Sequence, residues 1–160
     1  MRAVPAETTF PLRQVVLRPH QRTEELAEPR DDDPDAGHYA AFDDAGHVVG
    51  TGTVGRHPPP WAPGGPGGET GPGWQIRGMA VAPGQRDRGI GSAVLSALLA
   101  HVREHGGGLV WCNARVPARG LYEHAGFHTV GEPFELGHIG LHIVMATPVP
   151  PPTEARTPRN

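Results

Sequence analysis

The chain contains no lysine, and this absence excludes several kinds of chemistry. All 14 basic residues are arginines, so a Schiff-base lysine, a phosphate-binding P-loop lysine and an ammonium general base are excluded. The single cysteine, Cys112, excludes an internal disulfide and a zinc site built from several cysteines. No segment approaches the 18 or so unbroken apolar residues that cross a membrane. The first seven residues also lack an apolar run of signal-peptide length, and we therefore expect a soluble cytoplasmic protein.

The chain also lacks an excess of positive charge. Its 17 acidic residues outnumber the 14 arginines, for a net charge of −3. Nucleic-acid-binding proteins usually carry a strong basic excess, so we expect neither a nucleic-acid nor a membrane partner. The length of 160 residues suits one domain with a core of its own.

Glycine and proline are abundant, with 23 and 19 residues, but they are concentrated in two segments. Residues 57–74 hold six of each, and residues 147–160 hold five prolines. A long loop inside a compact domain is usually functional or disordered. We therefore expect one domain over residues 1–146, interrupted by the loop 57–74 and followed by a disordered tail, 147–160.

Apolar patterns between these segments predict the order of helices and strands. A turn at 43–46 separates two apolar runs, which is typical of a hairpin. The clearest helix covers Ile90–Glu104, where apolar residues recur at helical spacing. In chain order we expect a helix or strand at 10–17, a helix start at 23–26, strands at 38–42, 47–54 and 75–81, a helix at 90–104, a strand at 109–112, a helix at 118–125, and strands at 127–130 and 141–145. This order predicts an α/β or α+β sandwich, with helices on a mixed, mostly antiparallel sheet.

The segment Met79–Ser92 (MAVAPGQRDRGIGS) contains the most specific functional signal. A strand runs into a turn, and two glycines, Gly89 and Gly91, open the long helix. The first turn of a helix has unpaired N–H groups and a partial positive charge, and glycine lets a ligand approach the backbone. The arginines at 86 and 88 add forked donors that suit phosphate oxygens. The segment therefore predicts a site for a pyrophosphate.

Two common phosphate-binding patterns do not fit this segment. The Walker A pattern needs a lysine after its second glycine, and the dinucleotide pattern G-x-G-x-x-G needs a glycine where Val94 stands. The pattern that does fit is R-x-x-G-x-G over Arg86–Gly91, directly after the Met-Ala-Val strand. A second pattern follows downstream, from Asn113-Ala114-Arg115 to Leu121–Phe127 (LYEHAGF).

Together these two patterns resemble the GNAT (GCN5-related N-acetyltransferase) superfamily, and the resemblance covers about Gly37–Ala146. The stretch LRQVVLRP and the ending GEPFE…HIVM are similar to a bacterial branch with unassigned substrates. The resemblance implies a GNAT-like fold and acetyl-CoA as co-substrate. It implies a general acid, Tyr122, which protonates the departing thiolate. It also implies a set of residues that binds acetyl-CoA: Met79, Ala80, Val81, Arg86, Asp87, Arg88, Gly89, Ile90, Gly91, Ser92 and Asn113.

The general base is not assigned by the resemblance. Some family members carry a glutamate four residues before the Met-Ala-Val triplet, but here Gln75 stands at that position and cannot take a proton. The alternatives are a water chain, His38, Glu135 and His142, and we also expect these three residues and Gln75 to contact the substrate. We expect direct attack by the primary amine of a small molecule or peptide. An acyl-cysteine on Cys112 is the alternative route, against which a buried structural thiol is favoured.

Other functions stay open at this point. Because Gln75 replaces the base, a non-catalytic acyl-CoA-binding module is an alternative, as are a longer acyl donor or a protein amine as acceptor. The protein is expected to be a monomer or homodimer. No metal site is expected, because none of the three H-x-x-x-H pairs has the glutamate that zinc proteases carry. The acidic stretch 30–35 is expected to be a solvated loop, with attraction of a cationic substrate as its alternative role.

Overall fold

The computed structural model describes residues 1–17, 19, 21–22, 29–61, 73–86, 88–137 and 140–152. Several predictions fall outside these ranges, namely the helix start at 23–26, the contribution of Asp87 and most of the 57–74 loop. The described elements, in chain order, are β1 (Arg2–Ala3), α1 (Ala6–Val16), η2 (Pro29–Asp32), β2 (Gly37–Phe42), β3 (Val48–Arg56), β4 (Gly73–Val81), α2 (Ile90–Glu104), β5 (Gly108–Arg115), η3 (Val116–Ala118), α3 (Arg119–His124), β6 (His128–Glu135) and β7 (Leu141–Val149).

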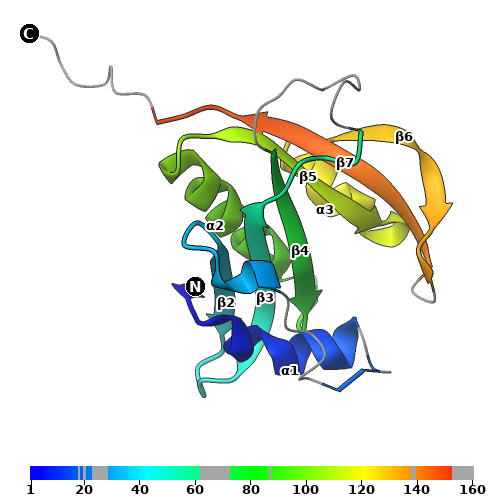
Figure 1. Cartoon of the computed structure of the whole chain (residues 1–160). Helices are drawn as coiled ribbons and strands as arrows, with labels where there is room; N and C mark the ends of the chain where they lie inside the picture. Colours follow the sequence, from blue (N-terminus) through cyan, green and yellow to red (C-terminus); the bar gives the residue numbers. More distant parts are fainter. Residues whose placement is uncertain are drawn as a thin grey trace, which may run out of the picture.

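The strands form one seven-stranded sheet in the order β1-β2-β3-β4-β5-β7-β6. All neighbouring strands are antiparallel except β4 and β5, which are parallel. Helix α1 packs on one part of the sheet, against β2, β3 and β4, whereas α2 also reaches β5 and β7 (Figure 1). The predicted fold class, a mixed and mostly antiparallel sheet with helices packed on it, is confirmed.

All the elements predicted from residue 38 onward occur, but β5, β6 and β7 continue three to five residues beyond their expected ends. Helix α2 covers the predicted residues and ends at Glu104, shortly before Gly106 and Gly107, which adopt φ values of 103° and 77° that favour glycine. The ambiguous stretch 10–17 belongs to a helix, although Pro11 lies inside it. Strand β7 continues to Val149 because it pairs with β5 as far as Gly108, three residues past the expected end of the domain.

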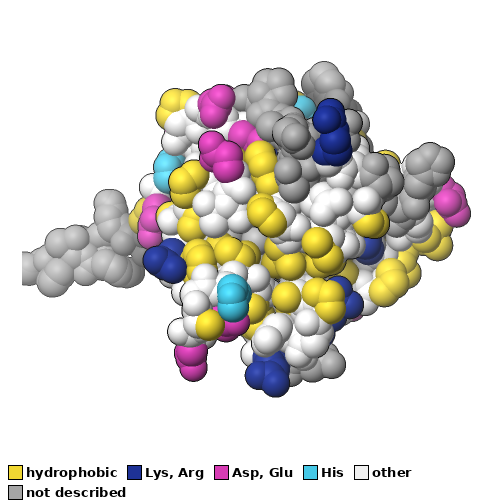
Figure 2. Space-filling model, turned by 90° about the horizontal axis from the view of Figure 1, so that it is seen from below, with side chains coloured by type: hydrophobic (Ala, Val, Ile, Leu, Met, Phe, Trp, Pro, Cys, Tyr) yellow, Lys and Arg dark blue, Asp and Glu magenta, His cyan; other side chains and the backbone are white. Residues whose placement is uncertain are grey.

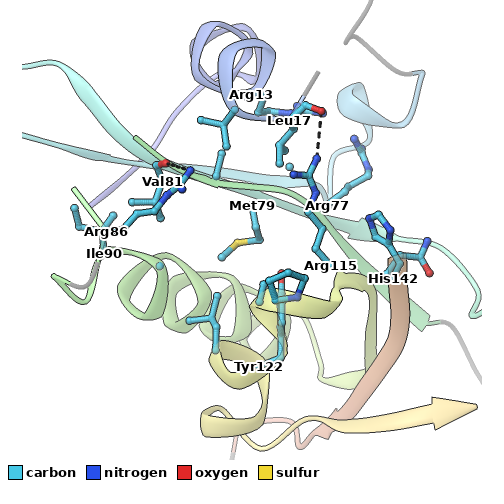
Figure 3. Close-up of a pocket in the computed structure, with 18 of the residues that line it drawn as sticks. Arg13, Leu17, Arg77, Met79, Val81, Arg86, Ile90, Arg115, Tyr122 and His142 are labelled. Carbon is cyan, nitrogen blue, oxygen red and sulfur yellow. Dashed lines mark hydrogen bonds between the residues drawn. The ribbon is translucent and has the colours of Figure 1, made fainter. Parts of the chain in front are cut away.

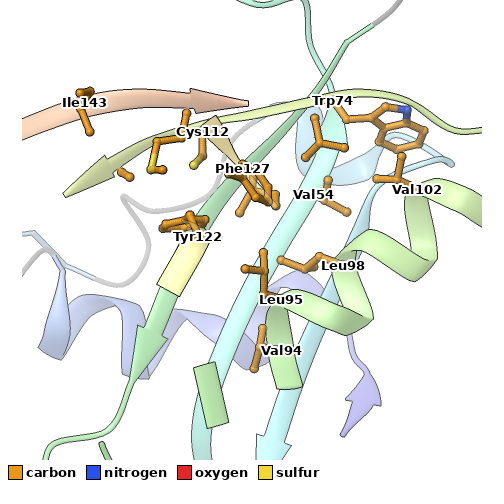
Figure 4. Packing of buried hydrophobic residues seen from close by; sticks show 14 residues of the cluster. Val54, Trp74, Val94, Leu95, Leu98, Val102, Cys112, Tyr122, Phe127 and Ile143 are labelled. Atoms are coloured by element: carbon orange, nitrogen blue, oxygen red, sulfur yellow. The ribbon is translucent and has the colours of Figure 1, made fainter. Parts of the chain in front are cut away.

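The core lies between the sheet and helices α2 and α3. Leu95, Leu98 and Val102 of α2 are fully buried against Val54 and Trp74 (Figure 4). Trp74 also donates a hydrogen bond from its indole N–H to the carbonyl of Gly107 (3.3 Å), so this end of the 57–74 loop is anchored in the core.

Close approach of α2 to the sheet depends on glycine in β3. A Cβ at Gly52 would stand 2.7 to 2.8 Å from Val94, Leu98 and Met79 side-chain atoms, which is closer than real carbon contacts allow. The neighbouring Thr51 and Thr53 point to the other face and are fully buried there. The alternation of glycine and threonine in β3 therefore lets the helix lie directly on the strand.

Candidate functional site

Strands β4 and β5 pair over only four residues and then separate. Their parallel pairing runs from Gly73–Leu109 to Ile76–Cys112. Beyond it β4 carries a bulge, where the register with β3 shifts between Thr51 and Thr53. Gly78 lies in this bulge with a φ of 67°, and its carbonyl accepts a hydrogen bond from the Thr51 hydroxyl (2.9 Å). Because a bulge bends its strand, the second half of β4 turns away from β5.

A cavity of about 890 Å³ lies where the two strands separate. This volume is within the range of pockets that bury a small molecule. Figure 3 shows part of its lining, which comes from α1, β4, the first turn of α2, β5, α3 and β7. The cavity brings together most of the residues that the sequence singled out: Gln75, Met79, Ala80, Val81, Arg86, Gly89, Ile90, Gly91, Ser92, Asn113, Tyr122 and His142.

One end of the cavity is the first turn of α2. Gly89 precedes this helix with a φ of 79°, and apart from its own chain neighbours no described residue has an atom within 4 Å of the place where a Cβ would stand. The first turn contains no acidic residue, so no carboxylate within that turn competes for the N–H groups. Arg86 donates to the carbonyl of Val81 (3.4 Å) and lines the cavity, whereas Arg88 is exposed and does not line it. This end therefore fits the pyrophosphate of a nucleotide cofactor.

Tyr122 lies in the cavity wall, between the first turn of α2 and His142 (Figure 3). Its side chain is 5% exposed and meets Phe127 edge to face, with ring centroids 5.4 Å apart. Its hydroxyl is hydrogen-bonded to the thiol of Cys112, and burial raises the pKa of Tyr122 well above the ordinary value of 10. Burial also raises the pKa of Cys112 to about 12. At neutral pH the tyrosine therefore holds its proton, and the cysteine is a poor nucleophile because it is not a thiolate.

Of the four candidate bases or substrate contacts, two line the cavity and two do not. Gln75 and His142 line it. His38 is buried on β2, where its ring is hydrogen-bonded to the Thr53 hydroxyl (3.0 Å) and the Asp31 carbonyl (3.2 Å). Glu135 is exposed on β6 and is not part of the lining. Sequence reasoning could not separate these four residues, because their positions depend on strand pairing.

The ring of His142 is held in one tautomer. It is 3% exposed, and its Nδ1 lies 2.8 Å from the carbonyl oxygen of Gly140. A carbonyl only accepts hydrogen bonds, so Nδ1 carries the proton and Nε2 of the neutral ring has a lone pair. Such an arrangement suits a general base.

Three arginines in the lining were given no role from the sequence. Arg13, Arg77 and Arg115 come from α1, β4 and β5. The sequence did contain a signal for two of them, because Arg13 and Arg77 each interrupt a mostly apolar stretch. Arg77 pairs with Asp31 at 2.9 Å, and the Asp31 side chain is only 6% exposed. The expectation that the acidic stretch is simply a solvated loop is therefore wrong for Asp31.

Within the described part of the chain, no three His, Cys, Asp or Glu side chains are grouped to hold a metal ion. Likewise, none of the helices described there is both long and apolar enough to cross a membrane.

Known proteins share both the sequence pattern and the fold. Residues 7–127 match the model of the acetyltransferase (GNAT) family. The chain is 31% identical over 145 residues to the uncharacterized N-acetyltransferase YitI of Bacillus subtilis (strain 168), covering 91% of this chain and 93% of that protein. Its fold is similar to a GNAT phosphinothricin acetyltransferase from Sinorhizobium meliloti in complex with AcCoA, with a TM-score of 0.66, 20% identity, and 96% and 95% of the two chains covered. It is also similar to an aminoglycoside 6'-N-acetyltransferase complexed with coenzyme A, with a TM-score of 0.61, 15% identity and 92% of each chain covered.

Proposed function

The chain belongs to the GNAT acetyltransferase family, and we propose that it transfers the acetyl group of acetyl-CoA directly to a primary amine, with Tyr122 as general acid. The family assignment confirms the resemblance seen in the sequence and makes the protein an acyl-CoA-dependent N-acyltransferase. The observation that carries the proposal is a single cavity that joins the glycine-lined first turn of α2 to Tyr122 and His142.

The residues of the cavity suit acetyl-CoA from end to end. Acetyl-CoA supplies a pyrophosphate and a reactive thioester. In this proposal the N–H groups of the first turn of α2 and the guanidinium of Arg86 bind the pyrophosphate. The edge of β4 beyond Ile76 no longer pairs with β5, so Met79 and Val81 can offer backbone groups to the pantetheine arm. Asn113 on the facing strand lines the same space.

In the proposed reaction two side chains move protons while one bond forms and another breaks. The amine nitrogen forms a bond to the acetyl carbon, and the bond from that carbon to sulfur breaks. His142 accepts the proton lost by the amine at Nε2, and Tyr122 gives its hydroxyl proton to the departing sulfur. The high pKa of Cys112 supports direct transfer over an acyl-cysteine.

A thermal-shift titration with acetyl-CoA, CoA and ATP tests the cofactor site. A ligand at 100 times its Kd should stabilise the protein by about 2.7 kcal/mol. We expect stabilisation by acetyl-CoA and CoA but not by ATP. The absence of any shift would show that Arg86–Gly91 only caps a helix, and the proposed function would be rejected.

Two glycine variants separate the cofactor site from general stability. Gly89 and Gly84 both have a positive φ, 79° and 85°, and a Cβ at either would meet no atom within 4 Å. Gly89→Ala and Gly84→Ala should therefore destabilise the fold by a similar amount, about 1–2 kcal/mol. Only Gly89 lines the cavity, so only Gly89→Ala should weaken CoA binding, by about tenfold or more in calorimetry. Equal CoA affinity in the two variants would contradict the site.

A further inference from the structure

The end of the cavity away from α2 is lined by arginine and by no described acid. Arg77, Arg115 and His142 lie at this end (Figure 3), Arg13 lines the cavity over Gly78, and no aspartate or glutamate is among the described lining residues. The chain as a whole has a net charge of −3, so this composition is not a property of the surface in general. Figure 2 shows that charges of both signs lie around a central field of hydrophobic side chains on one face.

These arginines are held in place by the fold. Arg13 is 6% exposed and donates to the Thr9 hydroxyl (3.3 Å), and its guanidinium lies over Gly78, where a Cβ would be 2.8 Å from its Nε. The side chain of Arg77 is 12% exposed and is fixed by its ion pair with Asp31. Burying a charged group is costly unless other charges or polar groups compensate for it. The fold nevertheless places these two arginines in a cavity wall.

Arg115 is the arginine best placed to meet a ligand. Among the described residues, Arg115 donates one hydrogen bond, to the carbonyl of Leu17 (3.3 Å), which is a neutral acceptor. It lies directly opposite His142 across the β5–β7 ladder, and residues opposite each other on a ladder have neighbouring side chains. In Figure 3, Arg77, Arg115 and His142 lie on the other side of Met79 from Arg86. The positive end is therefore beside the proposed base and apart from the pyrophosphate end.

We infer that the acceptor amine carries a compact oxyanion, a carboxylate or a phosphonate, which Arg115 binds with help from Arg77 and Arg13. The planar fork of a guanidinium matches such a group with two parallel hydrogen bonds. The anion would orient the acceptor so that its amine lies near His142. This inference rests on the proposed function and adds the chemical class of the acceptor. An anionic acceptor differs from the cationic acceptor that the acidic stretch 30–35 suggested. Asp31 of that stretch pairs with Arg77 instead.

A panel of matched amines tests the charge of the acceptor. The panel contains glycine, β-alanine, 4-aminobutyrate, glutamate and aminomethylphosphonate, the amides of the carboxylic acids, and spermidine as a cationic probe. Acetylation is followed by CoA release. The same compounds are added to the CoA-saturated protein in a thermal-shift assay, which does not depend on turnover.

We expect the kcat/KM of at least one acid to exceed that of its own amide about tenfold or more, since charge-assisted hydrogen bonds are roughly twice as strong as neutral ones. The same acid should raise the Tm of the CoA complex. The phosphonate distinguishes the two kinds of oxyanion.

The variant Arg115→Gln tests which residue recognises the anion. It should reduce the ratio of the kcat/KM values of the preferred acid and its amide to about one, while the affinity for CoA stays unchanged. Arg119→Gln is the matched control, because Arg119 is exposed on α3, pairs with Glu123 and does not line the cavity. A merely structural role of Arg115 would lower both values together.

The outcomes separate this inference from the proposed function. Amides or spermidine that equal or exceed the acids would overturn the inference. The inference would also be overturned if CoA binds but no acid is acetylated and no acid stabilises the CoA complex. In that case the cofactor site would still stand. Failure of acetyl-CoA and CoA to stabilise the protein would instead overturn the proposed function itself.

Discussion

Replacing Tyr122 by Phe removes one hydroxyl from the cavity wall and leaves the ring in place. The ring is 5% exposed and keeps its edge-to-face contact with Phe127. The variant loses the hydrogen bond to the Cys112 thiol, and the loss of such a bond lowers the free energy of unfolding by about 0.5–1.5 kcal/mol. Tyr122→Phe should therefore fold and should bind CoA with the affinity of the wild type.

The expected effect on the rate is much larger than the effect on the fold. General acid catalysis contributes about 10²–10⁴-fold, so kcat should fall at least about 100-fold, which corresponds to about 2.7 kcal/mol of activation free energy. The assay is CoA release at saturating acetyl-CoA, with an amine that the wild type acetylates. Calorimetry of CoA binding shows whether the loss lies in catalysis or in binding.

Two results would refute this reasoning. A Tyr122→Phe enzyme with full kcat would remove the hydroxyl from the mechanism. A wild-type kcat that falls above about pH 9, with the fall absent in Tyr122→Phe, would contradict the burial argument, because a raised pKa keeps the hydroxyl protonated there. Cys112→Ala is the companion variant. It keeps the hydroxyl and removes only its partner, so kcat should stay near that of the wild type, whereas an acyl-cysteine route would be abolished.

Further predictions concern the base, the pH dependence of stability and the packing of α2. His142→Gln should lower kcat/KM about 100-fold in CoA-release kinetics, with unchanged CoA affinity. His38→Gln alters a residue outside the cavity and should keep the kcat of the wild type. The reverse pattern would reject His142 as the base. Burial lowers the pKa of His101 below 6.5, so protonation favours the unfolded state. Stability in urea titrations should thus decline as the pH falls from about 7 through 6, and a decline that persists unchanged in His101→Gln would contradict this cause. Gly52→Ala should lower the free energy of unfolding by about 1–3 kcal/mol through overpacking. Gly120→Ala changes a glycine in open space on α3 and should raise that free energy by about 0.5–1 kcal/mol. Equal effects of the two variants in urea titrations would refute the packing argument.

Local sequence patterns were sufficient for the elements whose cause is local. Helix α2 has the bounds that its apolar spacing predicted, and Gly89 adopts the positive φ for which glycine is suited. The turn after Phe42 joins the two strands of the predicted hairpin. These features depend on backbone conformation and on side chains within one or two turns of each other. The same locality explains why two short motifs were enough to identify the family.

The tertiary structure alone decided which side chains share the cavity. His38 and His142 are the same residue type on strands, yet only His142 lies in the cavity, because β7 pairs with β5 beside the point where β4 turns away. The arginines at 13, 77 and 115 are far apart in the sequence and meet only when α1, β4 and β5 are packed together. Periodicity tells which face of an element is apolar, but it does not tell which elements are neighbours. The sequence alone therefore determined the fold class and the cofactor motif, whereas the charge and shape of the cavity end beside His142 came from contacts between distant segments.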